Sequence, residues 1–293
     1  MPQPVVSRIE FTKMSGAGND FVVVDNRDGI VQDPDRFALV LCDRRSGIGA
    51  DGLLLLERSP AADFGMKYYN ADGSYGGMCG NGGRCISRFA FHKRIVTSPE
   101  LRFEALDYVY GALIRSTGVE LRMKPPAHLS LRIEIEISAG QLLVHFIDTG
   151  SPHCVILLDE NKILGSLSSL NVSLLGKEIR THRVFLPEGT NVNFLEMNPS
   201  SSFSIRTYER GVEAETLACG TGSVASAIIV AELKNVAAPI SIGVQSGEKL
   251  MVNFKKATKG SYSDVSLSGS AHIIFDGRVM YDFSSHSIID VEA

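Results

Sequence analysis

The chain has 293 residues, of which 44% are apolar and 21% are charged, ordinary values for a globular protein that can bury a core without disulfides or metals. Its formal net charge of -4 disfavours nucleic acid as a partner, because phosphate binding usually requires a basic excess. No apolar run approaches the ~20 residues needed to span a bilayer, and residues 1–11 lack the apolar core of a signal peptide. We therefore expect a cytoplasmic protein that partners neither nucleic acid nor a membrane.

The first half of the chain is predicted to alternate short strands with glycine turns. Strands are expected at 8–14, within 15–26, at 50–57 and at 64–69. A glycine-dense stretch at 70–84 then leads into a helical pattern at 85–95, and three further strands follow at 101–106, 108–116 and 119–125. Pro125 and Pro126 break the pattern and mark a predicted domain boundary.

The second half repeats this layout. Strands are expected at 131–138, 141–148, 153–159 and 203–211, followed by a second glycine turn at 215–223 and a helical pattern at 224–235. Four more strands are expected at 241–246, 249–255, 264–269 and 272–276. Each half thus contains one Cys-Gly-x-Gly turn that opens a helix, at 79–82 and at 219–222, and this pattern indicates an internal duplication.

The five cysteines are scattered along the chain, at Cys42, Cys79, Cys85, Cys154 and Cys219. An odd count without a CxxC pair or zinc-type Cys/His spacing suits neither a disulfide framework nor a metal site. We expect free thiols in a reducing compartment and no bound metal. Cys42, Cys85 and Cys154 are interpreted as small buried residues.

The two cysteine turns carry the chemistry that the sequence predicts. Glycines at a helix start allow close approach of a ligand, and the N–H groups there attract a carboxylate. The same surroundings lower the pKa of a cysteine and raise its thiolate fraction. Cys79 and Cys219 could therefore hold one amino acid between them, one removing the α-proton while the other returns a proton to the opposite face. Because the proton on the α-carbon of an amino acid is very weakly acidic, N–H groups in a site that excludes water must stabilise the carbanion.

Other interpretations remain open on the residues alone. A lysine Schiff base with pyridoxal phosphate could serve as the electron sink, although no convincing signature for it is present. Glycine turns whose cysteines merely pack are a structural alternative. A third alternative is an amino-acid-binding protein without activity, but binding alone does not require a thiol on each face of the ligand.

Several motifs along nearly the whole chain resemble those of diaminopimelate epimerases. They are GAGNDF at 16–21, DRRSGIGADG at 43–52, NADGS at 70–74, MCGNGGRC at 78–85, GSPHCV at 150–155, GTNVNF at 189–194, YERG at 208–211 and ACGTG at 218–222. The resemblance implies an α/β (α+β) fold of two pseudo-symmetric domains, each a strand barrel around a central helix, with the site in the cleft between them. It places the N-terminal half at 1–124, with a tail at 277–293 that returns to it, and the C-terminal half at 125–276.

The resemblance also implies roles for individual residues. Cys79 and Cys219 would be the acid and base pair of a cofactor-independent epimerisation of LL- to meso-diaminopimelate, for lysine and peptidoglycan synthesis. Substrate contacts would come from Asn19, Asn70, Gly80, Asn81, Ser151, Asn191, Glu209, Arg210, Gly220 and Thr221, with His153 bordering the site. Without the motifs, Asn19 and Asn70 could serve turn geometry, Glu209 and Arg210 could be a solvated pair, and His153 could be a packed loop residue. The family favours a homodimer, and the oligomeric state stays open.

The chain departs from the family pattern at four places. Ser151 stands where asparagine is usual, Tyr75 replaces an acidic residue, and Ser270 stands where proline is common. The segment 212–217 is one residue longer than usual. Because a site that loses a polar contact tends to lose discrimination, an amino-acid racemase with a different or broader substrate is the alternative function.

Overall fold

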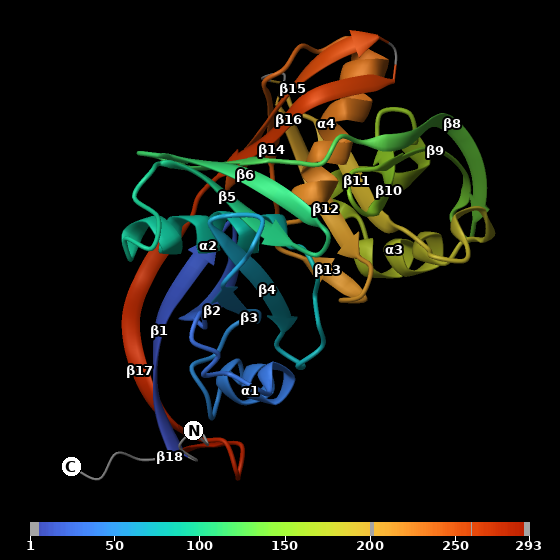
Figure 1. Ribbon diagram of the computed structural model, residues 1–293. Helices are drawn as coiled ribbons and strands as arrows, with labels where there is room; N and C mark the ends of the chain where they lie inside the picture. The colour runs from blue at the N-terminus through green and yellow to red at the C-terminus, as the bar shows by residue number, and fades with distance from the viewer. Residues whose placement is uncertain (1–5, 200–201, 259, 290–293) are drawn as a thin grey trace. The chain divides into compact units, whose positions relative to one another are not determined.

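The computed structural model describes residues 6–199, 202–258 and 260–289 (Figure 1). These divide into two compact units: the described residues up to Leu121 together with those from Gly269 onward form unit 1, and Arg122–Ser268 contains unit 2. The predicted domain ranges also take in 1–5, 200–201, 259 and 290–293, which lie outside the described residues. Both units combine strands and helices, so the chain has the mixed α/β composition predicted from the sequence.

The described residues of unit 1 form a mixed sheet with two helices. Its strands are β1 (Val6–Gly16), β2 (Asn19–Asp25), β3 (Gly52–Glu57), β4 (Phe64–Asn70), β5 (Glu100–Ala105), β6 (Tyr108–Arg115), β7 (Gly118–Arg122), β17 (His272–Asp282) and β18 (Ser287–Ile289), and its helices are α1 (Pro34–Leu41) and α2 (Gly80–His92). β1 pairs antiparallel with both β17 and β2. The sheet then continues through β2–β3 parallel, β3–β4 antiparallel, β4–β5 parallel, and β5–β6–β7 antiparallel.

Unit 2 has the remaining elements. Its strands are β8 (Ala127–Ile137), β9 (Gly140–Asp148), β10 (Pro152–Leu157), β11 (Asn191–Met197), β12 (Phe203–Glu209), β13 (Ala214–Thr216), β14 (Ile240–Gly243), β15 (Lys249–Thr258) and β16 (Ser261–Gly269), and its helices are α3 (Val172–Arg180) and α4 (Gly220–Lys234). Short 3₁₀ turns lie at Lys162–Leu164, Leu167–Ser169 and Arg183–Phe185.

The order of strand pairings in unit 1 recurs in unit 2. β9–β10 is antiparallel, β10–β11 parallel, β11–β12 antiparallel, β12–β14 parallel, and β14–β15–β16 antiparallel. In each unit the cysteine-headed helix lies in the chain between the two partners of the second parallel pair, where a crossover helix is expected. Sequence and pairing therefore repeat together.

Each of these helices is packed against the strands of its own unit. α2 contacts β1–β4 and β6, and α4 contacts β9–β11, β14 and β15 (Figure 1). Nearly every residue of α4 from Gly220 to Ala231 is buried, as expected for a helix that is apolar on all sides. The helix starts are thereby held by long-range packing, which gives the two cysteines a rigid support.

The apolar cores account for three of the cysteines. Cys42 packs in a cluster formed by β1–β3, α1 and Tyr281, and Cys154 in a cluster of unit 2. Cys85 is fully buried on α2. Burial raises the pKa of Cys42 to about 12 and that of Cys154 further still, because a thiolate is poorly solvated in an apolar core. The prediction that these three residues belong to the core is confirmed.

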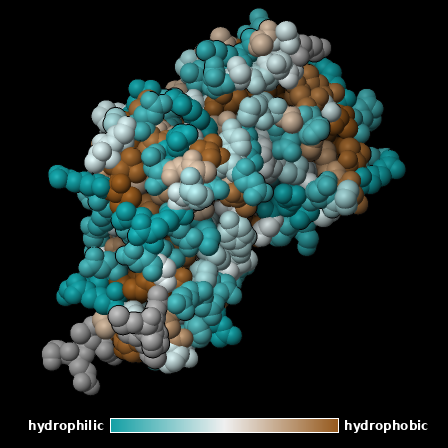
Figure 2. Space-filling view, in the orientation of Figure 1, coloured by the Kyte–Doolittle hydropathy of each residue, from teal (hydrophilic) through white to brown (hydrophobic). Residues whose placement is uncertain are grey.

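In the described ranges, no helix has both the length and the apolar character needed to cross a bilayer. On the face shown in Figure 2, hydrophobic patches are separated by hydrophilic side chains. That mixture is usual, because apolar atoms supply much of any folded protein's surface.

Candidate active site

Cys79 caps the N-terminus of α2. Its backbone is extended (φ -115°, ψ 122°), and its Sγ accepts a hydrogen bond from the N–H of Gly82 at 3.4 Å. The cap position is usually taken by a side-chain oxygen of Ser, Thr, Asp or Asn. Sulfur is a weak acceptor as a thiol and a much better one as a thiolate, and the positive end of the helix dipole favours the anion. The predicted glycine turn that opens a helix is present, and the cysteine lies at its first position.

The residues beside Cys79 form a polar chain within unit 1. Asn81 is buried, and its Nδ2 donates to Oδ1 of Asn19 at 2.6 Å. Arg84, also fully buried, donates from Nη2 to Oδ1 of Asn81 at 2.8 Å and from Nη1 to the carbonyl of Gly80 at 3.3 Å. Asn19 in turn donates from Nδ2 to Oδ2 of Asp51 at 3.0 Å. Two predicted contact residues, Asn19 and Asn81, are thus brought together next to the cysteine turn.

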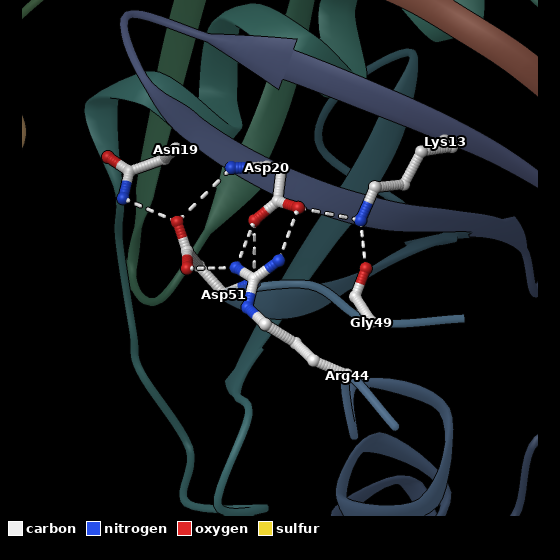
Figure 3. A network of polar contacts seen from close by, with 6 residues as sticks. All are labelled: Lys13, Asn19, Asp20, Arg44, Gly49 and Asp51. Atoms are coloured by element: carbon white, nitrogen blue, oxygen red, sulfur yellow. Dashed lines mark hydrogen bonds and ion pairs between the residues drawn. The ribbon is translucent and has the colours of Figure 1, made fainter. Parts of the chain in front are cut away.

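Charged side chains hold Asp51, the last residue in this series of hydrogen bonds (Figure 3). Arg44 donates from Nη2 to Oδ1 of Asp51 at 2.7 Å and also forms a two-point contact with Asp20. Lys13 donates to Asp20 at 2.7 Å and to the carbonyl of Gly49. Burial alone would raise the pKa of Asp20, but hydrogen bonds from Arg44 and Lys13 outweigh it and lower that pKa to about 2. Asp20 therefore stays ionised at neutral pH and holds both cations.

Asn70 has a more local arrangement. It ends β4, and its Nδ2 donates to Oγ of Ser74 at 2.9 Å while its backbone N–H donates to the Ser74 carbonyl. Gly73 in this turn has φ 84°, a conformation that glycine adopts without strain. Tyr75, the substitution for an acidic residue, packs its ring against Tyr69 with centroids 5.4 Å apart. The contacts of Asn70 are those of a turn residue.

Cys219 caps α4 in the same way as Cys79 caps α2. Its backbone angles are φ -114° and ψ 114°, and its Sγ accepts from the N–H of Gly222 at 3.4 Å. The Oγ1 of Thr221 lies 3.5 Å from the same sulfur. A Cβ at Gly222 would come within 2.3 Å of Oδ1 of Asn193, so the glycine is required by close packing and not by backbone angle.

His153 connects this turn to β10. It is fully buried, and its Nε2 lies 2.9 Å from Oγ1 of Thr221 and 3.0 Å from Oγ of Ser151. Burial, followed by the positive charge of Arg210, lowers the pKa of His153 to about 3. His153 is therefore neutral at physiological pH. Among the polar side chains predicted for unit 2, His153, Ser151 and Thr221 lie together.

Asn193, which the sequence analysis did not single out, sets the tautomer of His153. Its Nδ2 donates to the carbonyl of Cys154 at 3.0 Å and lies 3.1 Å from Nδ1 of His153, and its Oδ1 accepts from Oγ1 of Thr207 at 3.0 Å. Because that nitrogen is a donor, Nδ1 of His153 accepts and Nε2 carries the hydrogen. The imidazole thus donates toward Thr221 and Ser151. The signal was available in the GTNVNF motif, where Asn193 is the second asparagine.

Three more predicted residues lie at the ends of β11 and β12. Asn191 donates from Nδ2 to the Pro152 carbonyl at 2.9 Å and accepts from the backbone N–H of Arg210 at 2.9 Å. Arg210 donates from Nη1 to the Glu188 carbonyl at 3.1 Å, and Glu209 accepts from Thr216 at 3.0 Å. Among the described residues, the side chains of Glu209 and Arg210 thus have separate partners, Thr216 and the Glu188 carbonyl, and are not paired with each other.

Glu209 is set apart electrostatically. Burial raises the pKa of its carboxyl, and the hydrogen bond from Thr216 only partly offsets the effect. Thr216 belongs to the segment that is longer than usual; this segment forms a hairpin in which β13 pairs with β12. In the turn that follows Arg210, Glu213 has φ 56°.

Within the described ranges, no group of three or more His, Cys, Asp or Glu side chains is arranged to hold a metal ion. Ser270, the fourth departure, accepts from the Ala17 N–H through Oγ at 3.1 Å and from Arg84 Nε through its carbonyl at 3.3 Å. The Oγ contact is one that a proline could not make.

Comparison with known proteins assigns this arrangement to a family. The sequence profile described as "Diaminopimelate epimerase" matches residues 11–107 and 145–271. A diaminopimelate epimerase of Chlorobaculum tepidum is 45% identical over 91% of this chain and 99% of its own length. The corresponding protein of Aquifex aeolicus is 38% identical over 92% and 98%.

Solved structures share the fold at much lower identity. A hydroxyproline epimerase from Agrobacterium vitis with bound trans-4-hydroxy-L-proline aligns with a TM-score of 0.70 at 15% identity, over 94% of this chain and 93% of that one. A phenazine biosynthesis protein from Bacillus anthracis aligns with a TM-score of 0.69 at 13% identity, over 93% and 99%.

The fold, the two cysteine-capped helices and the sequence matches define an isomerase of the class that epimerises amino acids without pyridoxal phosphate. Within that class, the chain belongs to the diaminopimelate epimerase family.

Proposed function

We propose that the chain interconverts LL- and meso-diaminopimelate by moving the α-proton between Cys79 and Cys219, without a cofactor. The observation that carries the proposal is the repeated cap: two cysteines with nearly the same backbone angles, each accepting a hydrogen bond from the N–H three residues later at 3.4 Å. One thiolate would remove the proton from one face of the α-carbon while the other thiol delivers a proton to the opposite face.

The helix starts suit the charge that develops in this reaction. Removal of the α-proton sends electron density into the substrate carboxylate, and N–H groups at a helix N-terminus stabilise an anion without reorganising. Gly80 and Asn81 at one start, and Gly220 and Thr221 at the other, are the proposed donors for the reacting end of the substrate. Asn19, Asn70, Ser151, Asn191, Glu209 and Arg210 are the proposed contacts for the rest of it, with His153 at its border.

The proposed assignments at the distal end follow from charge. Diaminopimelate carries a second α-amino acid group at its distal end. Its ammonium requires a negatively charged side chain and its carboxylate a positively charged one. The guanidinium of Arg210 suits a carboxylate, and an ionised Glu209 suits an ammonium group.

We also propose that the two units are pseudo-symmetric domains with the division at about 124 and 276, supported by the recurring pairings, and that the enzyme acts in the cytoplasm.

The second candidate is an amino-acid racemase with a different or broader substrate on the same two thiols. The observation that favours it is Ser151, a short side chain whose Oγ lies 3.0 Å from His153 and 3.4 Å from Oγ1 of Thr221. A hydroxyl offers fewer hydrogen bonds than the usual amide, so the distal group of the substrate would be held less specifically.

Incubation of the reduced protein with LL-diaminopimelate in heavy water tests both candidates. The expected result is the meso isomer with deuterium at the α-carbon and no added cofactor, detected by chiral chromatography and mass spectrometry. Exchange with other L-amino acids at comparable kcat/KM would favour the second candidate. Absence of exchange with diaminopimelate and with the whole amino-acid panel would contradict both.

A further inference from the structure

The side-chain amides of Asn19 and Asn81 have a defined direction. An asparagine can present either its oxygen or its NH₂ group to a neighbour, so the neighbours decide the orientation. Arg84 can only donate, and it lies 2.8 Å from the oxygen of Asn81. Asp51, as a carboxylate, can only accept, and it lies 3.0 Å from the nitrogen of Asn19. The bond of 2.6 Å from Asn81 Nδ2 to Asn19 Oδ1 then follows with the same sense.

Arg84 and Asp51, the two ends of this series of hydrogen bonds, are each held by further contacts. Arg84 is fully buried on α2 and also donates to the carbonyls of Gly80 and Ser270 at 3.3 Å each. Asp51 accepts from Arg44 at 2.7 Å and from the backbone N–H of Asp20 at 3.2 Å (Figure 3). Rotation of either amide by half a turn would bring an N–H group against the guanidinium or an oxygen against the carboxylate. The cation and the carboxylate therefore oppose reversal from opposite ends.

The direction determines what Asn19 can offer a ligand. One hydrogen of its Nδ2 is used by Asp51, and its Oδ1 accepts from Asn81. In the described part of the chain, the second Nδ2 hydrogen has no acceptor, and the side chain is only partly buried. The group that Asn19 presents is accordingly an N–H donor, which suits a carboxylate oxygen.

We infer that Asp51 and Arg84 are positioning residues for the substrate, because they orient Asn19 and Asn81 so that Asn19 presents a donor and not an acceptor. The inference rests on the proposed function, in which Asn19 and Asn81 contact the amino acid. Neither Asp51 nor Arg84 reacts. They act through the two amides.

Asp51 is the better residue for a test, because its side chain is 36% exposed whereas Arg84 is fully buried. Asp51→Ala removes the acceptor that orients Asn19. Asp51→Asn removes the charge but retains an oxygen that can accept from Asn19. Asp20→Asn is the matched control, because Asp20 also binds Arg44 while its carboxylate makes no contact with the Asn19 amide.

Steady-state kinetics on diaminopimelate separate positioning from a general loss of structure. Asp51→Ala is expected to raise KM by about tenfold, the equivalent of one lost hydrogen bond to a charged group. Asp51→Asn should restore KM to near that of Asp20→Asn, since an amide oxygen again receives the Asn19 hydrogen. Equal KM values for Asp51→Ala and Asp20→Asn would overturn the inference, whatever the changes in Tm.

A second measurement needs no turnover. The side-chain ¹H–¹⁵N signals of Asn19, assigned from their absence in Asn19→Asp, should move in Asp51→Ala and stay in place in Asp20→Asn. Signals that do not move in Asp51→Ala would also overturn the inference. If wild-type protein fails to turn over diaminopimelate, the proposed function is wrong, and the NMR comparison still decides whether Asp51 orients the amide.

Discussion

The starts of α2 and α4 share a backbone and differ in their polar surroundings. Both place a cysteine in extended conformation with its sulfur 3.4 Å from the N–H three residues later. The residue two positions after the cysteine is Asn81 in one turn, held by the buried cation of Arg84, and Thr221 in the other, held by the neutral imidazole of His153. The repeat thus preserves the position of the sulfur and leaves each neighbourhood with its own chemistry. Under the proposed mechanism, in which the two thiols act on opposite faces of one carbon, such a difference allows each thiol to be adjusted separately.

The largest expected effect comes from replacing the cysteine that both turns share. Cys79→Ser and Cys219→Ser should each slow epimerisation by about 10³-fold or more, because a hydroxyl is a far weaker acid than a thiol and general acid–base groups contribute 10²–10⁴-fold. Serine is a good N-cap, so Tm should change little. Initial rates of meso formation and circular-dichroism melts measure the two quantities. Retention of one tenth of wild-type activity by either variant would rule out the two-cysteine mechanism.

The next prediction separates the turns by their packing. A Cβ at Gly222 would lie 2.3 Å from Oδ1 of Asn193, whereas one at Gly82 would lie 3.0 Å from Cδ2 of Leu54. Gly222→Ala should therefore cost about 3 kcal/mol of unfolding free energy and Gly82→Ala about 1 kcal/mol, within the usual range for overpacking. Urea titrations of the two variants compare them directly. Equal losses would show that the turns are packed alike.

His153, beside the Cys219 turn, should make the free energy of unfolding depend on pH. Its folded pKa is about 3 against about 6.5 in an unfolded chain. Because the unfolded chain binds a proton at His153 more readily than the folded protein, the free energy of unfolding is highest at a pH above about 6.5 and decreases as the pH falls below that value. Between pH 8 and pH 5 the loss should be roughly 2 kcal/mol.

This contribution can be isolated by replacing the residue. His153→Gln should lower the dependence of unfolding free energy on pH over that range, relative to wild type. His128→Gln, at an exposed histidine, is the matched control and should leave the dependence unchanged. The same slope in the wild type and in both variants would show that His153 does not supply it.

The smallest expected effect concerns Ser151. Ser151→Asn supplies the amide that is usual in the family and should raise the preference for diaminopimelate over other amino acids by a few-fold, about 1 kcal/mol for one hydrogen bond. Ratios of kcat/KM across an amino-acid panel measure this change. A preference already many thousandfold in the wild type would exclude the broader substrate range.

The sequence predicts the two cysteine turns at the helix starts but not the residues that support them. Cys79 and Cys219 stand out because each lies in a Cys-Gly-x-Gly turn, and a repeated motif is visible in one dimension. Asp51 and Asn193 act through contacts to residues distant in the chain, which no local pattern indicates. Arg84 lies only three residues after Asn81, but its burial cannot be read from the local sequence. Asn70 remains a predicted substrate contact, and its side-chain amide donates to Ser74 in its own turn.

Two short helices were also missed, for reasons that the structure makes plain. α1 has eight residues and begins at Pro34, a helix-start signal that was overlooked. In α3, Val172, Leu175 and Ile179 have helical spacing, and Asn171 caps the first turn. Gly176 weakens that pattern, yet it is required because a Cβ there would lie 2.3 Å from Cβ of Tyr208. Tertiary packing selected a residue that local helix propensity disfavours.

The sulfur caps have a consequence for how the protein would respond to its own reaction. An N–H group that stabilises a thiolate is itself held more firmly by that thiolate, since coupling between two equilibria is reciprocal. Under the proposed two-thiol mechanism, each proton transfer should therefore tighten the first turn at one cysteine and relax it at the other. Over a catalytic cycle the two helix starts would alternate in firmness, so that amide hydrogen exchange at Gly82 and Gly222 records which sulfur holds the proton.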